Sequence, residues 1–218
     1  AGAVAARALA PRQVERIGVV GCGVQARLQV EELRRVVECR RVLVWGRRRE
    51  ALESYRREIE ASGFEVAVTS DVGEIGPACQ LIVTATPSKV PLLRAEDVAP
   101  GTHVTAVGAD TVGKQELEAA LLGRADIVVA DSLAQCRERG EIAAALAAGE
   151  IDENDVVELG DLLAGRRAGR AGGAEGDRQI SVADLTGVAV QDLAAARAVL
   201  EAVAAEAPRD AEGETSDA

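Results

Sequence analysis

The sequence lacks methionine altogether, even at its first position, and it contains a single histidine. It also has no apolar run of about 18 or more residues, the length that a membrane-spanning helix needs. Its N-terminus does not show the basic segment followed by an apolar segment that marks a signal peptide. From these absences we expect a cytoplasmic protein, and the missing methionine suggests a piece of a longer polypeptide.

The cysteines form no C-x-x-C pair, and no group of histidines accompanies them. Structural metal sites and the disulfide frameworks of small secreted domains both need closely spaced ligands or paired cysteines. We therefore predict no metal site and four reduced thiols, at Cys22, Cys39, Cys79 and Cys136.

Lysine is scarce in this chain, and acidic residues outnumber basic ones by 36 to 25. The formal net charge is −11 at pH 7, and lysine occurs only at positions 89 and 114. An acidic surface does not attract polyanions, because binding to them depends on neutralising their negative charges. We therefore expect neither nucleic acid nor an anionic membrane as a partner.

A glycine-rich stretch near the N-terminus organises the rest of the chain. The apolar run Ile17–Val20 ends at Gly21 and Gly23, and a helical pattern over residues 24–37 follows at once. In a strand, turn and helix of this kind, backbone N–H groups at the helix start can bind a pyrophosphate. Gly21 would make the bend, Gly23 would let the phosphate approach, and Ala26 would allow close helix packing. The stretch predicts a dinucleotide site; a glycine turn that binds nothing is the alternative.

Apolar runs and helical patterns alternate along most of the 218 residues, which are 48% hydrophobic. This alternation predicts an α/β fold with a doubly wound parallel sheet of Rossmann type. We expect a helix over residues 1–13, a dinucleotide-binding domain over 14–187, a helix over 188–206 and a disordered acidic tail over 207–218. The expected strands cover residues 17–20, 41–45, 64–69, 79–84, 102–107, 126–130 and 179–185.

The residue after the second strand bears on the choice between NAD and NADP. NAD-specific sites of this fold place an acid there to bind the ribose 2′-hydroxyl. This chain has Gly46 and Arg47 instead, and a guanidinium group suits a 2′-phosphate. We therefore predict NADP or NAD as the cofactor, with NADP favoured; the alternative is that Arg47 only begins a solvated helix.

Hydroxyl groups gather at the end of the fourth expected strand, at Thr84, Thr86 and Ser88. Open α/β sheets bind ligands at the carboxyl ends of their strands. These hydroxyls can therefore contact the ribose or a phosphate of the cofactor. Alternatively, they form the turn itself.

Asp110 follows the fifth expected strand in a loop that contains Gly108 and Gly113. A carboxylate at the level of the nicotinamide can transfer a proton or stabilise an iminium carbon. Asp110 can also be the N-cap of a helix that starts near Lys114. His103 lies inside the same strand and is predicted to be a packed strand residue rather than a catalytic base.

Six motifs occur in a fixed order and together carry a family resemblance. Over about residues 3–205 the chain resembles the ornithine cyclodeaminase/mu-crystallin family, and within it the archaeal-type alanine dehydrogenase branch. The motifs are Gly21-Cys-Gly-Val-Gln-Ala26, Thr84-Ala-Thr-Pro-Ser88, Gly101-Thr-His-Val-Thr-Ala-Val-Gly-Ala-Asp110, Gly113-Lys-Gln-Glu-Leu117, Gly140-Glu141 and Thr186-Gly-Val-Ala-Val-Gln-Asp192.

The resemblance implies roles for single residues. Asp110 would act on the substrate amine or imine carbon, and Arg47 would select the cofactor. Leu185 departs from the serine that the family has beside the nicotinamide. The residues implied to bind the cofactor are Gly21, Gly23, Val24, Gln25, Ala26, Arg47, Thr84, Ala85, Thr86, Val107, Gly108, Thr186 and Gly187.

The resemblance also implies an activity. Family members are NAD(P)-dependent oxidoreductases or cyclodeaminases that act on a small α-amino or α-imino acid. They begin with a domain of roughly a hundred residues, a common domain size, which forms a homodimer and supplies substrate-binding groups. We expect this chain to lack that domain. A non-catalytic NAD(P)-binding fragment or subunit is therefore the alternative to an enzyme.

Overall fold

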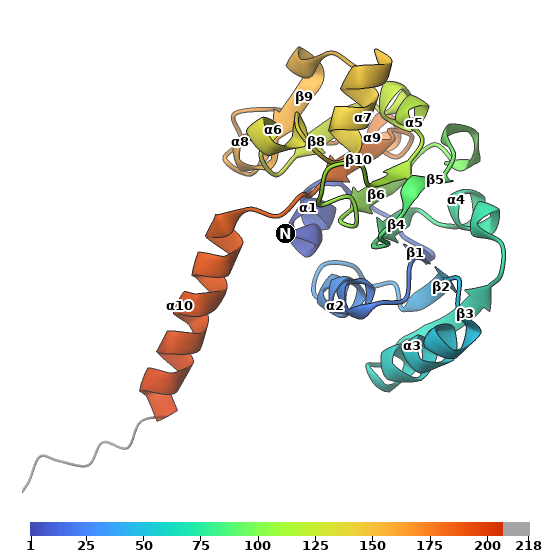
Figure 1. Ribbon diagram of the computed structural model, residues 1–218, viewed down its shortest axis with the longest axis vertical. Helices are drawn as coiled ribbons and strands as arrows, with labels where there is room; N and C mark the ends of the chain where they lie inside the picture. Colours follow the sequence, from blue (N-terminus) through green and yellow to red (C-terminus); the bar gives the residue numbers. More distant parts are fainter. Residues whose placement is uncertain (207–218) are drawn as a thin grey trace, which may run out of the picture. The chain divides into compact units, whose positions relative to one another are not determined.

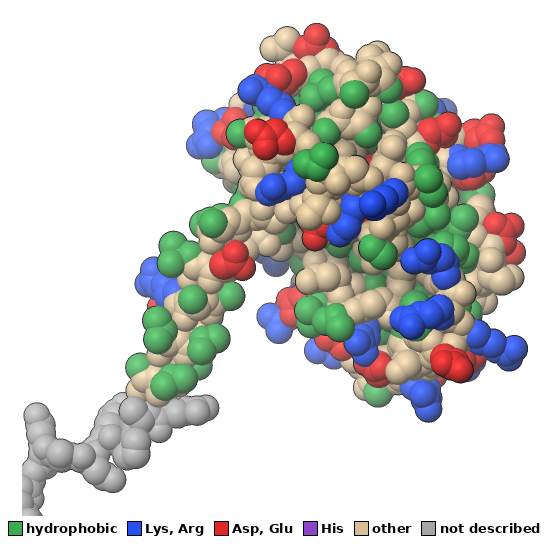
Figure 2. All heavy atoms as spheres, in the orientation of Figure 1, with side chains coloured by type: hydrophobic (Ala, Val, Ile, Leu, Met, Phe, Trp, Pro, Cys, Tyr) green, Lys and Arg blue, Asp and Glu red, His purple; other side chains and the backbone are tan. Residues whose placement is uncertain are grey.

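The computed structural model describes residues 1–206 and contains two compact units (Figure 1). The first unit is Ala1–Gly187, and the second begins at Val188 and contains helix α10 (Ala189–Glu206). Figure 2 shows nonpolar side chains along the length of α10. The acidic tail predicted over residues 207–218 lies outside the described residues.

Within residues 1–206, eight strands form one parallel sheet in the order β3-β2-β1-β4-β6-β10-β8-β9. This confirms the predicted doubly wound parallel sheet. After β1 the chain adds β2 and β3 on one side of β1. It then crosses back and adds β4 and the later strands on the other side, so the strand order reverses between β1 and β4. The strands are β1 (Ile17–Val20), β2 (Arg41–Trp45), β3 (Glu65–Thr69), β4 (Leu81–Thr84), β6 (His103–Ala106), β8 (Ile127–Ala130), β9 (Val156–Glu158) and β10 (Ser181–Asp184).

Helices cover both faces of this sheet. The evidence is that alternate strand residues point to different sides and belong to different buried clusters. Ile17 and Val19 pack with the cluster that contains Val30 of α2, whereas Val20 packs with Leu121 of α5. Burial on both faces explains the nearly continuous apolar runs of the strands. The helices are α1 (Gly2–Leu9), α2 (Val24–Leu33), α3 (Arg49–Ala61), α4 (Ile75–Ala78), α5 (Ala119–Arg124), α6 (Leu133–Cys136), α7 (Glu141–Ala148), α8 (Leu159–Leu163) and α9 (Gly173–Gly176).

Several elements differ from the sequence-based expectation. The predicted helix over residues 24–37 ends at Leu33, and the Arg40 guanidinium group binds the carbonyl oxygens of Val37 and Arg34 at 2.7 and 3.2 Å. Within residues 1–206, three strands were not predicted. One is β9 at the edge of the main sheet, and the other two, β5 (Lys89–Leu93) and β7 (Gln115–Leu117), form a separate two-stranded parallel sheet. The suggested helix start near Lys114 is therefore wrong, because the chain is extended there.

The end of α1 is tied to the sheet by one side chain, Arg170. Its guanidinium group donates hydrogen bonds to the carbonyl oxygens of Leu9, Gly176, Gln179 and Thr102 at 2.5, 2.6, 2.6 and 3.3 Å, and to Ser181 Oγ at 3.0 Å. This guanidinium group thereby links α1, the segment before β6 and the start of β10.

His103 is fully buried in β6, as predicted for a packed strand residue. Its two ring nitrogens lie 2.9 Å from Ser181 Oγ and 3.0 Å from Thr105 Oγ1. Burial, reinforced by the positive charge of Arg170, lowers its pKa to about 3. The imidazole is therefore neutral at pH 7.

All four cysteines carry free thiols, as predicted. In the described part of the chain, no three or more His, Cys, Asp or Glu side chains are grouped so that they could hold a metal ion. Over the same residues, the helices are too short or too polar to cross a bilayer.

Candidate functional site

A cavity of about 470 Å³ lies where the strand order reverses. It is formed by the loops that follow β1, β2 and β4, the three strands around the reversal. Ligands of open α/β sheets bind at this position, outside the carboxyl ends of the strands. Its lining residues are Gly21, Cys22, Gly23, Trp45, Gly46, Arg47, Arg48, Ala85, Thr86 and Pro87.

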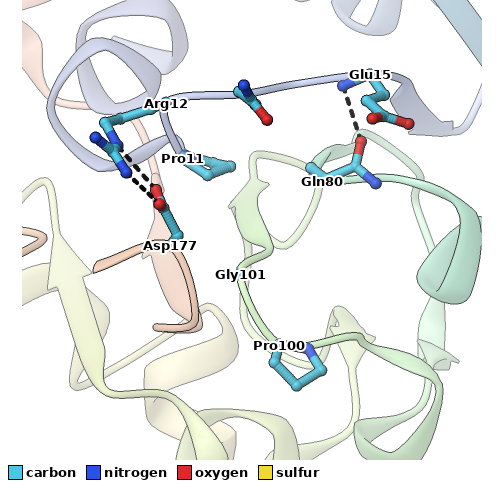
Figure 3. Close-up of a pocket in the computed structure, with 8 residues that line it drawn as sticks. Pro11, Arg12, Glu15, Gln80, Pro100, Gly101 and Asp177 are labelled. Carbon is cyan, nitrogen blue, oxygen red and sulfur yellow. Dashed lines mark hydrogen bonds and ion pairs between the residues drawn. The ribbon is translucent and has the colours of Figure 1, made fainter. Parts of the chain in front are cut away.

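A second cavity, of about 650 Å³, lies at the opposite, amino edge of the sheet (Figure 3). Arg12 and Asp177 point toward each other across it and form an ion pair, and the Glu15 N–H donates to Gln80 Oε1 at 2.9 Å. These residues precede strands rather than follow them, and their polar groups bind one another. The first cavity is therefore the better candidate for a ligand site.

The two glycines of the turn after β1 play different parts. Gly21 has φ +116°, and a Cβ there would lie 2.6 Å from the carbonyl oxygen of Ala85, so the fold itself needs this glycine. Gly23 has an extended backbone with φ −86°, and a Cβ there would meet nothing within 4 Å. The fold does not require a glycine at position 23, whereas a ligand that approaches the backbone would require one.

Helix α2 begins directly at this turn, with Gly23 as its N-cap and no side-chain capping hydrogen bond. Its first turn contains no acidic residue, so the positive end of the helix dipole is not neutralised locally. Val24 and Gln25 are exposed on this turn, whereas Ala26 is buried in the core. A helix start of this kind can accept an anion, and its binding of a pyrophosphate stays a prediction.

Basic and aromatic side chains form the end of the cavity beyond β2. The indole N–H of Trp45 donates to the carbonyl oxygen of Ser70 at 3.2 Å, which fixes the ring. Arg47 and Arg48 are exposed and form no ion pair within residues 1–206. Figure 2 shows Lys and Arg side chains gathered over the part of the first unit that contains α2 and α3.

The hydroxyl groups after β4 bind the protein itself. Thr84 is fully buried and its hydroxyl donates to Glu116 Oε2 at 2.8 Å. Thr86 Oγ1 accepts from the N–H of Ser88 at 3.3 Å, and Ser88 Oγ donates to the carbonyl oxygen of Val90 at 2.7 Å. The structure thus supports turn formation for the Thr86 and Ser88 hydroxyls, whereas the Thr84 hydroxyl binds Glu116. On this side the cavity wall consists of Ala85, Thr86 and Pro87.

Asp110 lies in the loop after β6, about half exposed, with its Oδ1 2.6 Å from Lys114 Nζ. It does not cap a helix, because β7 follows. The cavity around the glycine turn does not include it. Its predicted place near the nicotinamide therefore remains a prediction.

Thr186 and Gly187 follow β10 and are bound by Asp131, which follows β8. The Thr186 hydroxyl donates to Asp131 Oδ1 at 3.2 Å and the Gly187 N–H donates to Asp131 Oδ2 at 2.8 Å. Sequence reasoning did not assign a role to Asp131. Its position directly after a strand is the signal that could have found it.

The model of the ornithine cyclodeaminase/mu-crystallin family matches residues 1–207. The chain belongs to this family. It is 40% identical over 202 residues to alanine dehydrogenase of Archaeoglobus fulgidus, covering 92% of this chain and 61% of that protein. It is 38% identical over 201 residues to iminosuccinate reductase of Paracoccus denitrificans, again covering 92% of this chain and 61% of the relative.

A solved structure of a family member shows the same architecture. An archaeal alanine dehydrogenase dimer with bound NAD superposes with a TM-score of 0.87 and 37% identity, over 94% of this chain and 62% of that one. This chain therefore spans about three fifths of the length of these relatives.

The residues that the family resemblance implied fall into three groups in the structure. The first group lines the cavity: Gly21, Gly23, Arg47, Ala85 and Thr86. A second group lies outside the lining, on the α2 start or in the neighbouring loops: Val24, Gln25, Val107, Gly108, Asp110, Thr186 and Gly187. The third group is buried, with Ala26 in the core and Thr84 bound to Glu116.

Proposed function

We propose that this chain is the NAD(P)-binding part of an oxidoreductase or cyclodeaminase that acts on a small α-amino or α-imino acid. Hydride would pass between the nicotinamide ring and the carbon that bears the nitrogen. The observation that carries the proposal is the pair of glycines: Gly21 is required by the turn, while Gly23 leaves the backbone open beside the cavity and the α2 start.

The relatives support this proposal. The archaeal alanine dehydrogenase, which is 37% identical to this chain, has NAD bound in its structure. Because the chain spans about three fifths of such relatives, we propose that residues outside it supply the remaining substrate-binding groups. The alanine dehydrogenase is a dimer, and we propose a dimer and a cytoplasmic location for the whole protein.

Titration of the chain with NADH and NADPH tests the proposal. Trp45, the single tryptophan, lies in the cavity wall and can transfer excitation energy to a bound reduced nicotinamide. We expect saturable energy transfer at a one-to-one ratio with either cofactor. Absence of saturable binding for both would contradict a dinucleotide site in this chain.

We propose that NADPH is preferred over NADH, because Arg47 and Arg48 offer positive charge where NAD sites of this fold have an acid. The Arg47→Asp variant should reverse the preference. We expect its Kd for NADPH to rise about 30-fold and its Kd for NADH to change less than about three-fold. An unchanged ratio of the two constants would show that Arg47 does not select the cofactor.

We propose that Asp110 handles a proton during turnover, with Lys114 holding its carboxylate at 2.6 Å. Asp110→Asn should lower kcat at least about 100-fold and leave the Kd for NADH within about two-fold. The assay requires a polypeptide that carries this chain together with the part of the relatives that it does not span. Retained kcat in the variant would remove Asp110 from the mechanism.

A further inference from the structure

Glu116 of β7 is a fully buried acid that contacts two loops of the candidate site. Its Oε1 accepts from the N–H of Thr86 at 2.6 Å, and its Oε2 accepts from the N–H of Gly108 at 2.9 Å and from the Thr84 hydroxyl at 2.8 Å. One carboxylate therefore joins the loop after β4 to the loop after β6.

The glycine turn rests on the same structure. A Cβ on Gly21 would meet the carbonyl oxygen of Ala85 at 2.6 Å and Thr86 Cγ2 at 3.1 Å, so this turn is in direct contact with the loop that Glu116 holds. A Cβ on Gly108 would meet Thr86 O at 2.3 Å and Glu116 Oε2 at 2.4 Å. A side chain at either glycine would therefore push the two loops apart.

Two further buried acids hold Glu116 in place from behind. Glu141, at the start of α7, accepts from the N–H groups of Glu116 and Leu117 at 2.8 and 3.0 Å. Asp184, at the end of β10, accepts from the N–H of Ile142 at 2.9 Å. Asp184 thus binds the backbone beside Glu141, and Glu141 binds the backbone of Glu116. The three acids are linked in this way from β10 in the sheet to the cavity wall.

We propose that Glu116 is the positioning residue of the dinucleotide site, with its carboxylate fixing the Ala85–Thr86 wall and Gly108 in the geometry that accepts the cofactor. This proposal rests on the proposed dinucleotide binding. Glu116 does not touch the cavity itself and acts through the two loops.

Glutamine at position 116 has the same shape but cannot make the same bonds. Its amide has one acceptor oxygen and one NH₂ group, whereas both carboxylate oxygens of Glu116 face a backbone N–H. One N–H, of Thr86 or of Gly108, would face the NH₂ group and lose its acceptor. The loop that carries this N–H is then expected to move.

The test compares Glu116→Gln with Glu118→Gln, a matched control two residues away. Glu118 also accepts from a backbone N–H, that of the buried residue Ala95 at 2.7 Å, but it contacts neither cavity loop. We expect Glu116→Gln to raise the Kd for NAD⁺ about 30-fold in calorimetric titration, and Glu118→Gln to leave it within about two-fold.

The pH profile of the same Kd separates positioning from a general loss of stability. Burial raises the pKa of the Glu116 carboxyl above its ordinary value. The ionisable groups that face it are Glu141 and, behind it, Asp184, whose pKa values burial raises to about 8 and about 7. Both acids remain in Glu116→Gln. As the pH is lowered through the raised pKa of Glu116, its carboxylate gains a proton and loses an acceptor, so we expect wild-type affinity to fall more than that of Glu116→Gln, which has no carboxyl at this position.

The outcomes are distinct. If the wild-type chain binds NAD⁺ and both variants bind it equally well with the same pH profile, the positioning role is refuted while dinucleotide binding stands. If the wild-type chain does not bind, the proposed function fails and this proposal with it. Should Glu116→Gln not fold, Glu116→Asp keeps the charge but withdraws the carboxylate by one methylene from the N–H groups of Thr86 and Gly108, and an unchanged Kd in that variant would overturn the proposal.

Discussion

Gly23→Val is expected to weaken NADH binding at least about 100-fold without unfolding the protein. Position 23 has φ −86° and ψ −175°, an extended conformation that suits a β-branched residue. A Cβ there meets no protein atom within 4 Å. The added side chain would instead occupy the space beside the α2 start that a pyrophosphate needs. Titration with NADH and denaturant unfolding of the same sample measure both effects.

Gly21→Ala is the informative contrast. Its backbone has φ +116°, and the new Cβ would lie 2.6 Å from the Ala85 carbonyl oxygen. We expect a loss of about 2 kcal/mol in the free energy of unfolding, with weaker binding as a consequence of the distorted turn. For Gly23→Val we expect a change below about 1 kcal/mol. Wild-type affinity in Gly23→Val would show that the cofactor does not approach this backbone.

Seven of the eight strands of the sheet could be predicted from the sequence, because strands buried in a parallel sheet consist of apolar runs; the edge strand β9, of three residues, was not predicted. Ile17–Val20 and Arg41–Trp45 were predicted with the bounds that the structure shows. The glycine turn was predictable for a different reason. Glycines between a strand and a helix indicate a positive φ or a close approach of a ligand to the backbone. Local residue pattern and local structure agree in these elements.

The supporting acids could not be predicted in this way. Glu116 receives hydrogen bonds from residues up to 32 positions away, and two of its three donors are backbone N–H groups that no residue type reveals. The strand that carries it has three residues, and its partner strand β5 contains a proline. Short polar strands have no apolar period from which they can be predicted. The hydroxyls after β4 were visible in the sequence, but their partner was not.

Arg170→Ala is expected to lower the free energy of unfolding by about 3 to 5 kcal/mol, because one side chain supplies the donors for four carbonyl oxygens and a hydroxyl. Burial lowers the pKa of Arg170, and the negative charges of Asp126 and Asp177 oppose this effect, so the partly desolvated charge is kept by these two acids together with the five acceptors. Lysine offers three donors in a different geometry. Arg170→Lys should therefore recover less than half of the loss.

Arg166→Ala is the matched control, because this exposed arginine of the same loop forms an ion pair only with Asp161 in the described part of the chain. Its cost should stay below about 0.5 kcal/mol in denaturant unfolding. Equal losses in the two variants would show that Arg170 is not the tie between α1 and the sheet. All acceptors of Arg170 lie at the amino edge, away from the candidate site. The Kd for NADH should therefore be unchanged wherever Arg170→Ala is folded, which distinguishes this stability effect from the loss of binding expected for Gly23→Val.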